Sequence, residues 1–305
     1  MRRIDVARLL ALAVIWSLSF VFVRVLVPVL GPVWVATGRV LIAGVALVLW
    51  FAVIGLDANV RAHWRAYLTV GIGNSALPFL LFAYAALHLP ASYLVILNAA
   101  APLFSAVASA IWLGERLTAL KIAALVLGAA GVALVSRAGP LVPDTAFALA
   151  VAASLGAALS YALAGVWLKK FGGALRPVAI AGWSQMLAGI ALLPIAAASP
   201  IAGPVTLGTV ANLLALALAC SAIAYLLYYR LIADVGPTRA MTVTFLLPAL
   251  GMCWGVLFLD ETVTLPMIAG AVLIVAGTVA VLRPSERRVV GPNAAGESTT
   301  TSAGG

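Results

Sequence analysis

Apolar stretches separated by short polar gaps run along almost the whole chain. The stretches are about as long as an α-helix must be to cross a hydrocarbon core of about 30 Å. The gaps contain helix-breaking pairs such as Gly31-Pro32 and Gly236-Pro237. The two-residue alternation typical of strands does not occur in these stretches. The pattern predicts an all-α integral membrane protein with ten spans, at residues 8–27, 33–55, 66–87, 91–113, 119–136, 145–168, 177–198, 207–230, 238–259 and 265–282.

The composition supports this prediction, because 65% of the 305 residues are hydrophobic and only 9% are charged. A soluble domain of this length would carry far more charge on its surface. Both cysteines, Cys220 and Cys253, lie inside apolar stretches, so a disulfide framework is not indicated. Residues 283–305 are rich in Gly, Ser and Thr and are predicted to form a disordered tail.

Lysine and arginine are unevenly divided between alternate gaps. One side of the predicted membrane has only Arg24 and Arg137 at its span ends and loops, whereas Arg39 lies within a span. Because cytoplasmic loops are enriched in Lys and Arg, we expect both termini to be cytoplasmic. The net charge of +9 is then a topology signal, not a sign of nucleic-acid binding. The cytoplasmic set is Arg2, Arg3, Arg8, Arg61, Arg65, Arg116, Lys121, Lys169, Lys170, Arg176, Arg230, Arg239, Arg283, Arg287 and Arg288.

The stretch from residue 91 to 135 recurs at residues 237–281, at an offset of 146 residues. The offset relates Pro102 to Pro248 and Glu115 to Glu261. It predicts two repeats, at residues 1–136 (spans 1–5) and 145–282 (spans 6–10). Five is an odd number of spans, so the two repeats must cross the membrane in opposite directions. Inverted repeats of this kind are typical of transporters that work by alternating access, with substrate bound near the midplane.

Several motifs recur in the order seen in one transporter family. They are Trp16-Ser17-x-x-Phe20, Arg39-x-Leu-Ile-Ala and Leu113-Gly114-Glu115-Arg116 with its degenerate second copy Asp260-Glu261-Thr262. With these motifs the chain resembles the EamA-type ten-helix exporters of the drug/metabolite transporter superfamily. The resemblance implies ten helices around a central cavity, export of amino acids or other small metabolites or drug-like compounds, and location in a bacterial inner (plasma) membrane. The small multidrug-resistance branch uses an acidic residue in the first helix for proton coupling, and this chain has none there.

Polar side chains near the middle of spans are the candidates for substrate contact. A proline within a helix frees the carbonyl four residues earlier, so Pro102 and Pro248 free those of Asn98 and Thr244. Arg39 lies about two turns into its span, where it either binds a substrate carboxylate or extends to the surface; the structural role is favoured. The predicted cavity residues are Trp16, Phe20, Arg39, Asn74, Tyr84, Tyr93, Asn98, Pro102, Tyr161, Trp183, Gln185, Ser221, Tyr225, Thr244 and Pro248.

Acidic residues lie only at the ends of spans or in gaps, which argues against proton antiport through an intramembrane carboxylate and against cationic drugs as substrates. Glu115 and Glu261 each precede a Thr that begins the next helix, at Thr118 and Thr264. A carboxylate there satisfies free backbone N–H groups, so we expect both to act as helix caps.

The leading prediction is a secondary transporter that exports amino acids or related small metabolites by alternating access. Multidrug or amphiphile efflux is the alternative within transport, and a membrane receptor or scaffold is the alternative outside it. An enzyme is not predicted, because His63 and His88 lie at loops or span ends and no nucleophile set is clustered within spans. We expect no catalytic residues, metal or cofactor. The expected partners are a small-molecule substrate and the lipid bilayer, without nucleic acid, and the pattern is compatible with a monomer.

Overall fold

The computed structural model describes residues 2–137 and 144–282, and over these ranges the chain forms helices and no strands. The tail predicted at residues 283–305 lies outside the described residues. Two segments, η1 and η3, are π-helical, and η2 is a single 3₁₀ turn. The elements are α1 Arg3–Val53, α2 Val60–Gly71, η1 Ile72–Ala76, α3 Leu77–Ala85, α4 Ala91–Asn98, α5 Ala101–Leu113, α6 Ala119–Arg137, α7 Thr145–Phe171, η2 Gly172–Ala174, α8 Pro177–Ala197, α9 Leu207–Leu214, η3 Ala215–Ile223, α10 Ala224–Val235, α11 Pro237–Ala240, α12 Val243–Leu259 and α13 Leu265–Leu282.

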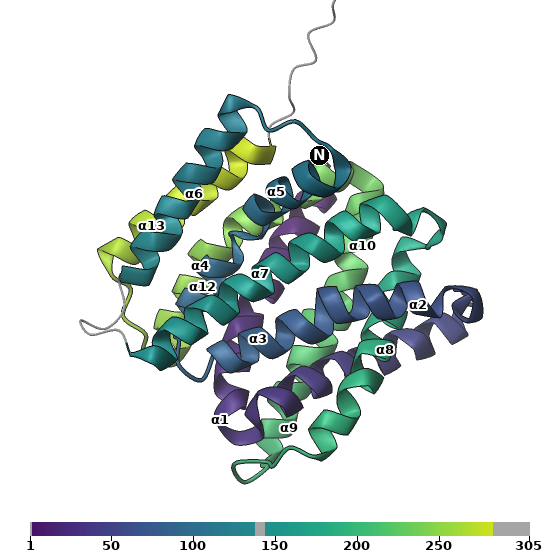
Figure 1. Ribbon diagram of the computed structural model, residues 1–305. Coiled ribbons are helices and arrows are strands. Elements are labelled where there is room, and N and C mark those ends of the chain that lie inside the picture. The colour runs from purple at the N-terminus through teal and green to yellow at the C-terminus, as the bar shows by residue number, and fades with distance from the viewer. Residues whose placement is uncertain (1, 138–143, 283–305) are drawn as a thin grey trace, which may run out of the picture.

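Eight helices in the described part of the chain are long and apolar enough to cross a membrane, where the sequence predicted ten spans. The difference has two causes. The first two predicted spans both lie in the 51-residue α1, and most of the ninth lies in the 17-residue α12. Within α1, Gly31 has φ 77° and ψ 160°, a conformation that favours glycine, and prolines at positions 28 and 32 flank it. Figure 1 shows the purple helix turning back on itself, so α1 consists of two helical arms.

Equivalent positions in the two halves end their helices in the same way. Gly114 after α5 and Asp260 after α12 both adopt the left-handed conformation, with φ 68° and 52°. The following N–H groups, of Glu115 and Glu261, donate to carbonyls six residues back at 3.3 and 3.1 Å. The N–H of the left-handed residue donates to the same carbonyl in each half, so both helices end in a widened last turn followed by a left-handed residue, a common way for a helix to end. The sequence repeat thus corresponds to a repeat in backbone geometry.

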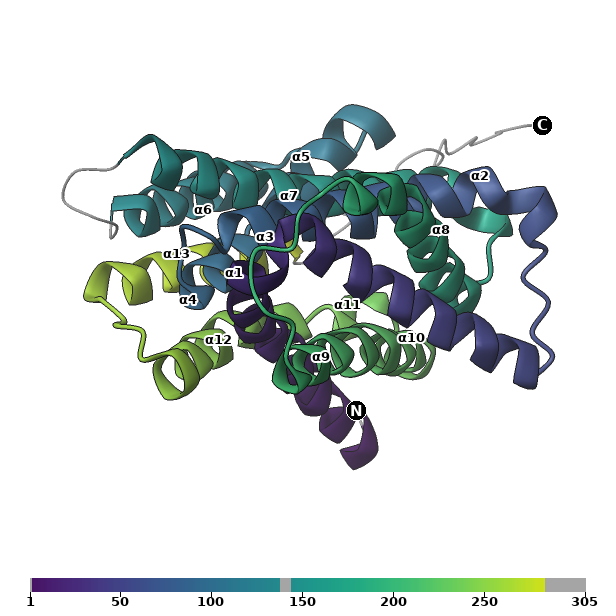
Figure 2. The same cartoon turned by 90° about the horizontal axis from the view of Figure 1, so that it is seen from below.

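Glycines bring α6 and α13 into backbone contact, and both views show the two helices side by side at one edge of the molecule (Figures 1 and 2). A Cβ placed on Gly131 would lie 2.7 Å from the carbonyl oxygen of Gly270. One placed on Gly277 would lie 2.7 Å from the carbonyl oxygen of Ala124. The repeat offset relates Gly131 to Gly277 and Ala124 to Gly270, so the two contacts are equivalent. The α6–α13 pair therefore has approximate two-fold symmetry.

The fourth and ninth predicted spans are each interrupted, and in both the interruption lies before the proline. In the fourth, α4 ends at Asn98 and α5 begins at Ala101, so Pro102 lies in the first turn of a new helix, where its missing N–H costs little. In the ninth, the break falls between α11 and α12, and Pro248 lies inside α12. The chain therefore breaks just before the proline in the fourth span and several residues before it in the ninth.

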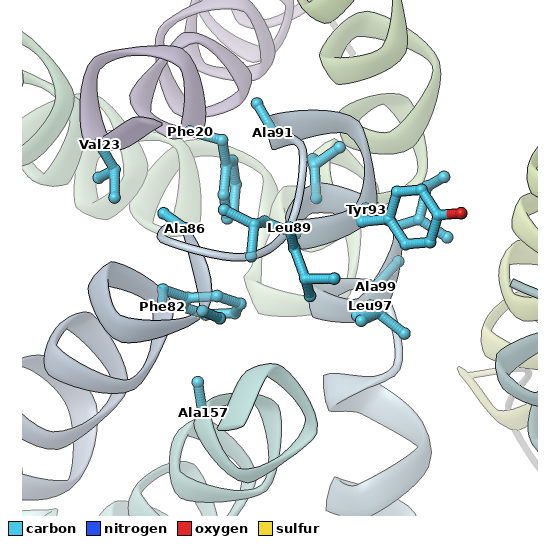
Figure 3. Packing of buried hydrophobic residues seen from close by; sticks show 14 of the residues in the cluster. Phe20, Val23, Phe82, Ala86, Leu89, Ala91, Tyr93, Leu97, Ala99 and Ala157 are labelled. Carbon is cyan, nitrogen blue, oxygen red and sulfur yellow. The ribbon is translucent and has the colours of Figure 1, made fainter. Parts of the chain in front are cut away.

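The core is centred on α4, whose residues from Ala91 to Leu97 are all buried. Figure 3 shows this helix beside Phe20 of α1 and Phe82 of α3, whose rings meet edge to face at 5.4 Å between centroids. Tyr93 packs against Phe147 of α7 at 6.1 Å. Helices from both halves therefore share one apolar core.

Glu261 caps a helix, as predicted, but the helix belongs to the other half. Its carboxylate accepts hydrogen bonds from the N–H of Ala91 at 2.6 Å, the N–H of Ser92 at 3.0 Å and the hydroxyl of Ser92 at 2.5 Å. These groups form the first turn of α4, where backbone N–H groups have no partner within the helix. Glu115 instead pairs with Lys169 at the end of α7, at 2.7 Å. Sequence spacing suggested local caps, and only the packing of the two halves shows these long-range partners.

Candidate functional site

A cavity of about 610 Å³ lies between the two halves of the molecule. Its volume is in the range of sites that enclose small organic molecules. The lining comes from α1, η1, α3, α4, α5, α7, α10 and α12, together with the turn before α12. Its residues are Trp16, Ser19, Phe20, Val23, Val35, Ala36, Arg39, Asn74, Phe79, Phe82, Asn98, Ala101, Pro102, Ser105, Tyr161, Ala162, Gly165, Leu168, Lys169, Tyr225, Tyr228, Met241, Val243, Thr244 and Leu247.

Much of the cavity wall follows the sequence repeat. Seven pairs of lining residues are separated by the same 146 positions that separate Glu115 from Glu261. Positions related by the sequence offset therefore lie on one wall, contributed by both halves of the chain. The pairs are Trp16 with Ala162, Ser19 with Gly165, Val23 with Lys169, Phe79 with Tyr225, Phe82 with Tyr228, Asn98 with Thr244, and Ala101 with Leu247.

Aromatic rings from both halves form most of the bulky surface of the cavity. Trp16 contacts Tyr225 and Tyr228 with centroid separations of 6.2 and 5.1 Å. On the other wall, Tyr161 lies 6.2 Å from Phe82, which in turn contacts Phe20. Such a lining favours an apolar or aromatic group and, through the faces of the rings, a cation.

Arg39 is the one buried charge on the wall, with only 8% of its surface exposed. Its Nε donates to the hydroxyl of Ser221 at 2.9 Å, and its Cζ lies 3.8 Å from the centroid of the Phe79 ring. The side chain therefore stays inside the protein, and the favoured prediction, extension to the surface, is wrong. Lys169, the second basic residue on the wall, is 65% exposed and paired with Glu115.

Exposure at the two ends of the cavity differs. Lys169 lies at the end of α7 and is open to solvent, so the cavity reaches the surface there. In the α3–α4 connection Leu89 is fully buried, and Glu261 caps the start of α4 nearby. Arg24 reinforces this end by donating from Nη1 to the carbonyl of Ala86 at 2.8 Å. The cavity therefore opens beside Lys169, whereas the α3–α4 connection is buried and held by hydrogen bonds.

Nine of the fifteen predicted cavity residues lie on the wall: Trp16, Phe20, Arg39, Asn74, Asn98, Pro102, Tyr161, Tyr225 and Thr244. Asn74 also donates from its side-chain amide to the hydroxyl of Tyr225 at 3.3 Å. Ser221 is fully buried behind the wall and holds Arg39. The structure therefore brings most of the polar candidates to one place.

The other five predicted residues lie elsewhere. Tyr84 packs against His88 near the end of α3, and Tyr93 lines a second cavity with Glu261 and acidic neighbours. Trp183 packs between apolar clusters on α8, and Pro248 is buried inside α12. Gln185 is buried, and its amide donates to the carbonyl of Ala181 at 3.0 Å. Trp183 and Gln185 belong to α8, which contributes no residue to the wall.

The prediction missed Phe79, Phe82 and Tyr228 among the bulky wall residues, along with Lys169. The repeat contained a signal for the first two, because they occupy the positions equivalent to Tyr225 and Tyr228. Applying the offset to aromatic residues would have found them.

The model of the EamA-like transporter family matches the chain twice, at residues 6–137 and 148–283. The chain belongs to this family. Family members are transporters of the drug/metabolite transporter superfamily, so this chain is a multi-pass membrane protein that handles small molecules, and the family does not indicate an enzyme.

Relatives agree with this assignment. The chain is 27% identical over 266 residues to the uncharacterized transporter YvbV of Bacillus subtilis (strain 168), covering 87% of each chain. It is 26% identical over 293 residues to a probable amino-acid metabolite efflux pump of Escherichia coli (strain K12), covering 91% of this chain and 94% of the relative. A solved structure described only as a crystal structure of a protein aligns with a TM-score of 0.63 at 18% identity, over 92% of this chain and 98% of the other. That last likeness concerns the fold alone.

Proposed function

We propose that this protein is a secondary transporter that exports amino acids or related small metabolites by alternating access. The observation that carries the proposal is the cavity wall, where seven pairs of residues follow the sequence repeat. Two states related by exchange of the repeats are then close in energy, and the cavity can open to either side in turn. A relative described as a probable amino-acid metabolite efflux pump supports the substrate class and the direction.

The proposed topology has ten spans in two inverted five-helix repeats, with both termini in the cytoplasm of a bacterium. The bend at Gly31 divides α1 into two spans, and α11 with α12 forms the ninth. Groups of charges predicted to share the cytoplasmic side do meet in space. Arg8 pairs with Asp234 of α10 at 2.6 Å, and Lys169 pairs with Glu115 at 2.7 Å. With this topology the cavity opens to the cytoplasm in the present conformation. The protein acts as a monomer and does not bind nucleic acid.

Two experiments test the proposal. Purified protein in proteoliposomes should move amino acids from a panel that also contains amphiphilic cations, under imposed pH or voltage gradients or in exchange. If no compound moves under any gradient, the protein is not a transporter of this kind. For topology, labels placed after residues 114 and 260 should report opposite sides of the membrane, and labelling from the same side would contradict the inverted repeats.

Multidrug efflux of cations is less well supported. Acidic side chains pair with cationic substrates inside membranes, and the wall residues of the cavity include no Asp or Glu within the described ranges. Transport of amphiphilic cations in preference to amino acids would reverse this assignment.

A further inference from the structure

The symmetry of the cavity wall fails at its one buried charge. Arg39 lies on the wall, whereas Gln185, at the equivalent position of the second half, is buried away from the cavity and donates to Ala181. If a residue served the opening and closing of two similar halves, an equivalent residue would be expected on the wall in each half. A residue present on one side only, and costly to bury, points to recognition of an asymmetric ligand.

The contacts of Arg39 leave part of its guanidinium free. Arginine has five N–H donors in a planar fork. The Nε donor is used by Ser221 at 2.9 Å, and one flat face covers Phe79 at 3.8 Å. In residues 2–137 and 144–282 no side chain or carbonyl accepts a hydrogen bond from the two terminal nitrogens. These nitrogens are therefore available to whatever occupies the cavity.

The charge of Arg39 is also uncompensated over the same part of the chain, where no acidic residue forms an ion pair with it. A buried cation without a partner is unfavourable, and a bound anion relieves the cost. The edge with two terminal nitrogens matches the spacing of the two oxygens of a carboxylate, which it can bind through two parallel hydrogen bonds.

Resting on the proposed function, we propose that Arg39 is the carboxylate subsite of this cavity, and that the substrates are apolar or aromatic carboxylates, α-amino acids among them. The aromatic rings take the body of the substrate. An ammonium group, where the substrate has one, lies against a ring face. Ser221 acts as a positioning residue, because it fixes the Nε edge and so directs the terminal nitrogens.

The test uses four compounds with the same phenyl group: phenylalanine, 3-phenylpropionate, phenethylamine and 3-phenylpropanol. Binding to the purified protein in lipid nanodiscs is measured by calorimetry, and each compound competes with labelled phenylalanine for transport in proteoliposomes. The wild type should bind the two carboxylates at least 10-fold more tightly than the amine and the alcohol. In Arg39→Gln that preference should fall by about 10- to 100-fold, because a charge-assisted bidentate contact is lost.

Three further variants separate recognition from folding. Arg39→Lys keeps the positive charge but loses the planar guanidinium, so it should retain part of the preference for carboxylates. Ser221→Ala should weaken binding of the two carboxylates and leave binding of the alcohol unchanged. Arg65→Gln removes an exposed arginine outside the cavity and should behave as wild type.

Three outcomes decide the question. If Arg39→Gln weakens the binding of all four compounds equally, or of none of them, Arg39 has only a structural role. The subsite is then disproved while the transport function stands. If the protein binds carboxylates through Arg39 but moves no compound of the amino-acid panel under any gradient, the subsite stands and the transport function fails. A wild-type protein that binds none of the four compounds overturns the subsite, and the amino-acid panel decides the transport function separately.

Discussion

The cap that Glu261 provides to α4 yields a quantitative prediction about how the two halves are held together. Substituting Gln for Glu261 keeps the shape of the side chain and replaces one acceptor oxygen by an amide NH₂. One oxygen accepts from the N–H of Ala91 and the other from the N–H and hydroxyl of Ser92. The hydroxyl can rotate to accept from the amide, but one backbone N–H is left without a partner whichever way the amide is oriented.

The expected loss follows from these contacts. A buried donor without a partner costs about 1–3 kcal/mol. Loss of the negative charge at the helix N-terminus adds about 0.3–1 kcal/mol. Glu261→Gln should therefore destabilise the protein by roughly 1–4 kcal/mol. The matched control is Glu115→Gln, which breaks an ion pair in which the side chains are 38% and 65% exposed and should cost at most about 1 kcal/mol.

The assay is thermal unfolding of both variants in the same detergent, in which the fraction of folded protein is measured against temperature. At about 2 °C per kcal/mol for a chain of this size, the midpoint should fall by roughly 2–8 °C for Glu261→Gln and by less than about 2 °C for the control. A double-mutant cycle with Ser92→Ala should show a coupling of at least about 0.5 kcal/mol. Equal shifts for the two glutamates, or no coupling to Ser92, would refute the cross-half cap.

Three further predictions concern packing, backbone strain and charge. Gly277→Ala places a Cβ 2.7 Å from a carbonyl oxygen of α6 and should cost about 1–3 kcal/mol, whereas Gly156→Ala, with its nearest contact at 3.5 Å, should leave the midpoint unchanged or higher in the same assay. Asp260→Gly should raise the midpoint slightly, since it relieves about 1 kcal/mol of left-handed strain at φ 52°; a lower midpoint would mean that the Asp side chain itself stabilises the fold. A hydrogen bond from Lys169 lowers the pKa of Glu115, so the pair stabilises the protein above the ordinary pKa of 4.5, and its contribution is lost as the pH falls through the lowered value. The difference in midpoint between wild type and Glu115→Gln should thus be present at pH 7 and shrink below pH 4.5, and a difference that grows in acid would contradict the ion pair.

The sequence by itself determined the helical class, and it also predicted the positions of the spans and the repeat. These properties are local or periodic. The length of an apolar stretch, a proline or glycine in a gap, and motifs such as that around Glu115 can all be found without knowing what packs against them. The pairing of Asn98 with Thr244 on the cavity wall also follows from the offset of the repeat.

Only the tertiary structure decided which side chains face the cavity. The helices are apolar on nearly every face, because lipid, core and cavity wall all accept apolar residues, so the sequence does not reveal the rotation of each helix. For this reason Tyr84 lies away from the wall while Phe79, on the same helix, lies on it. Long-range contacts were equally inaccessible, since the cap from Glu261 to α4 joins residues about 170 positions apart. The burial of Arg39 without an acidic partner among residues 2–137 and 144–282, which carries the proposed subsite, becomes visible only when both halves are in place.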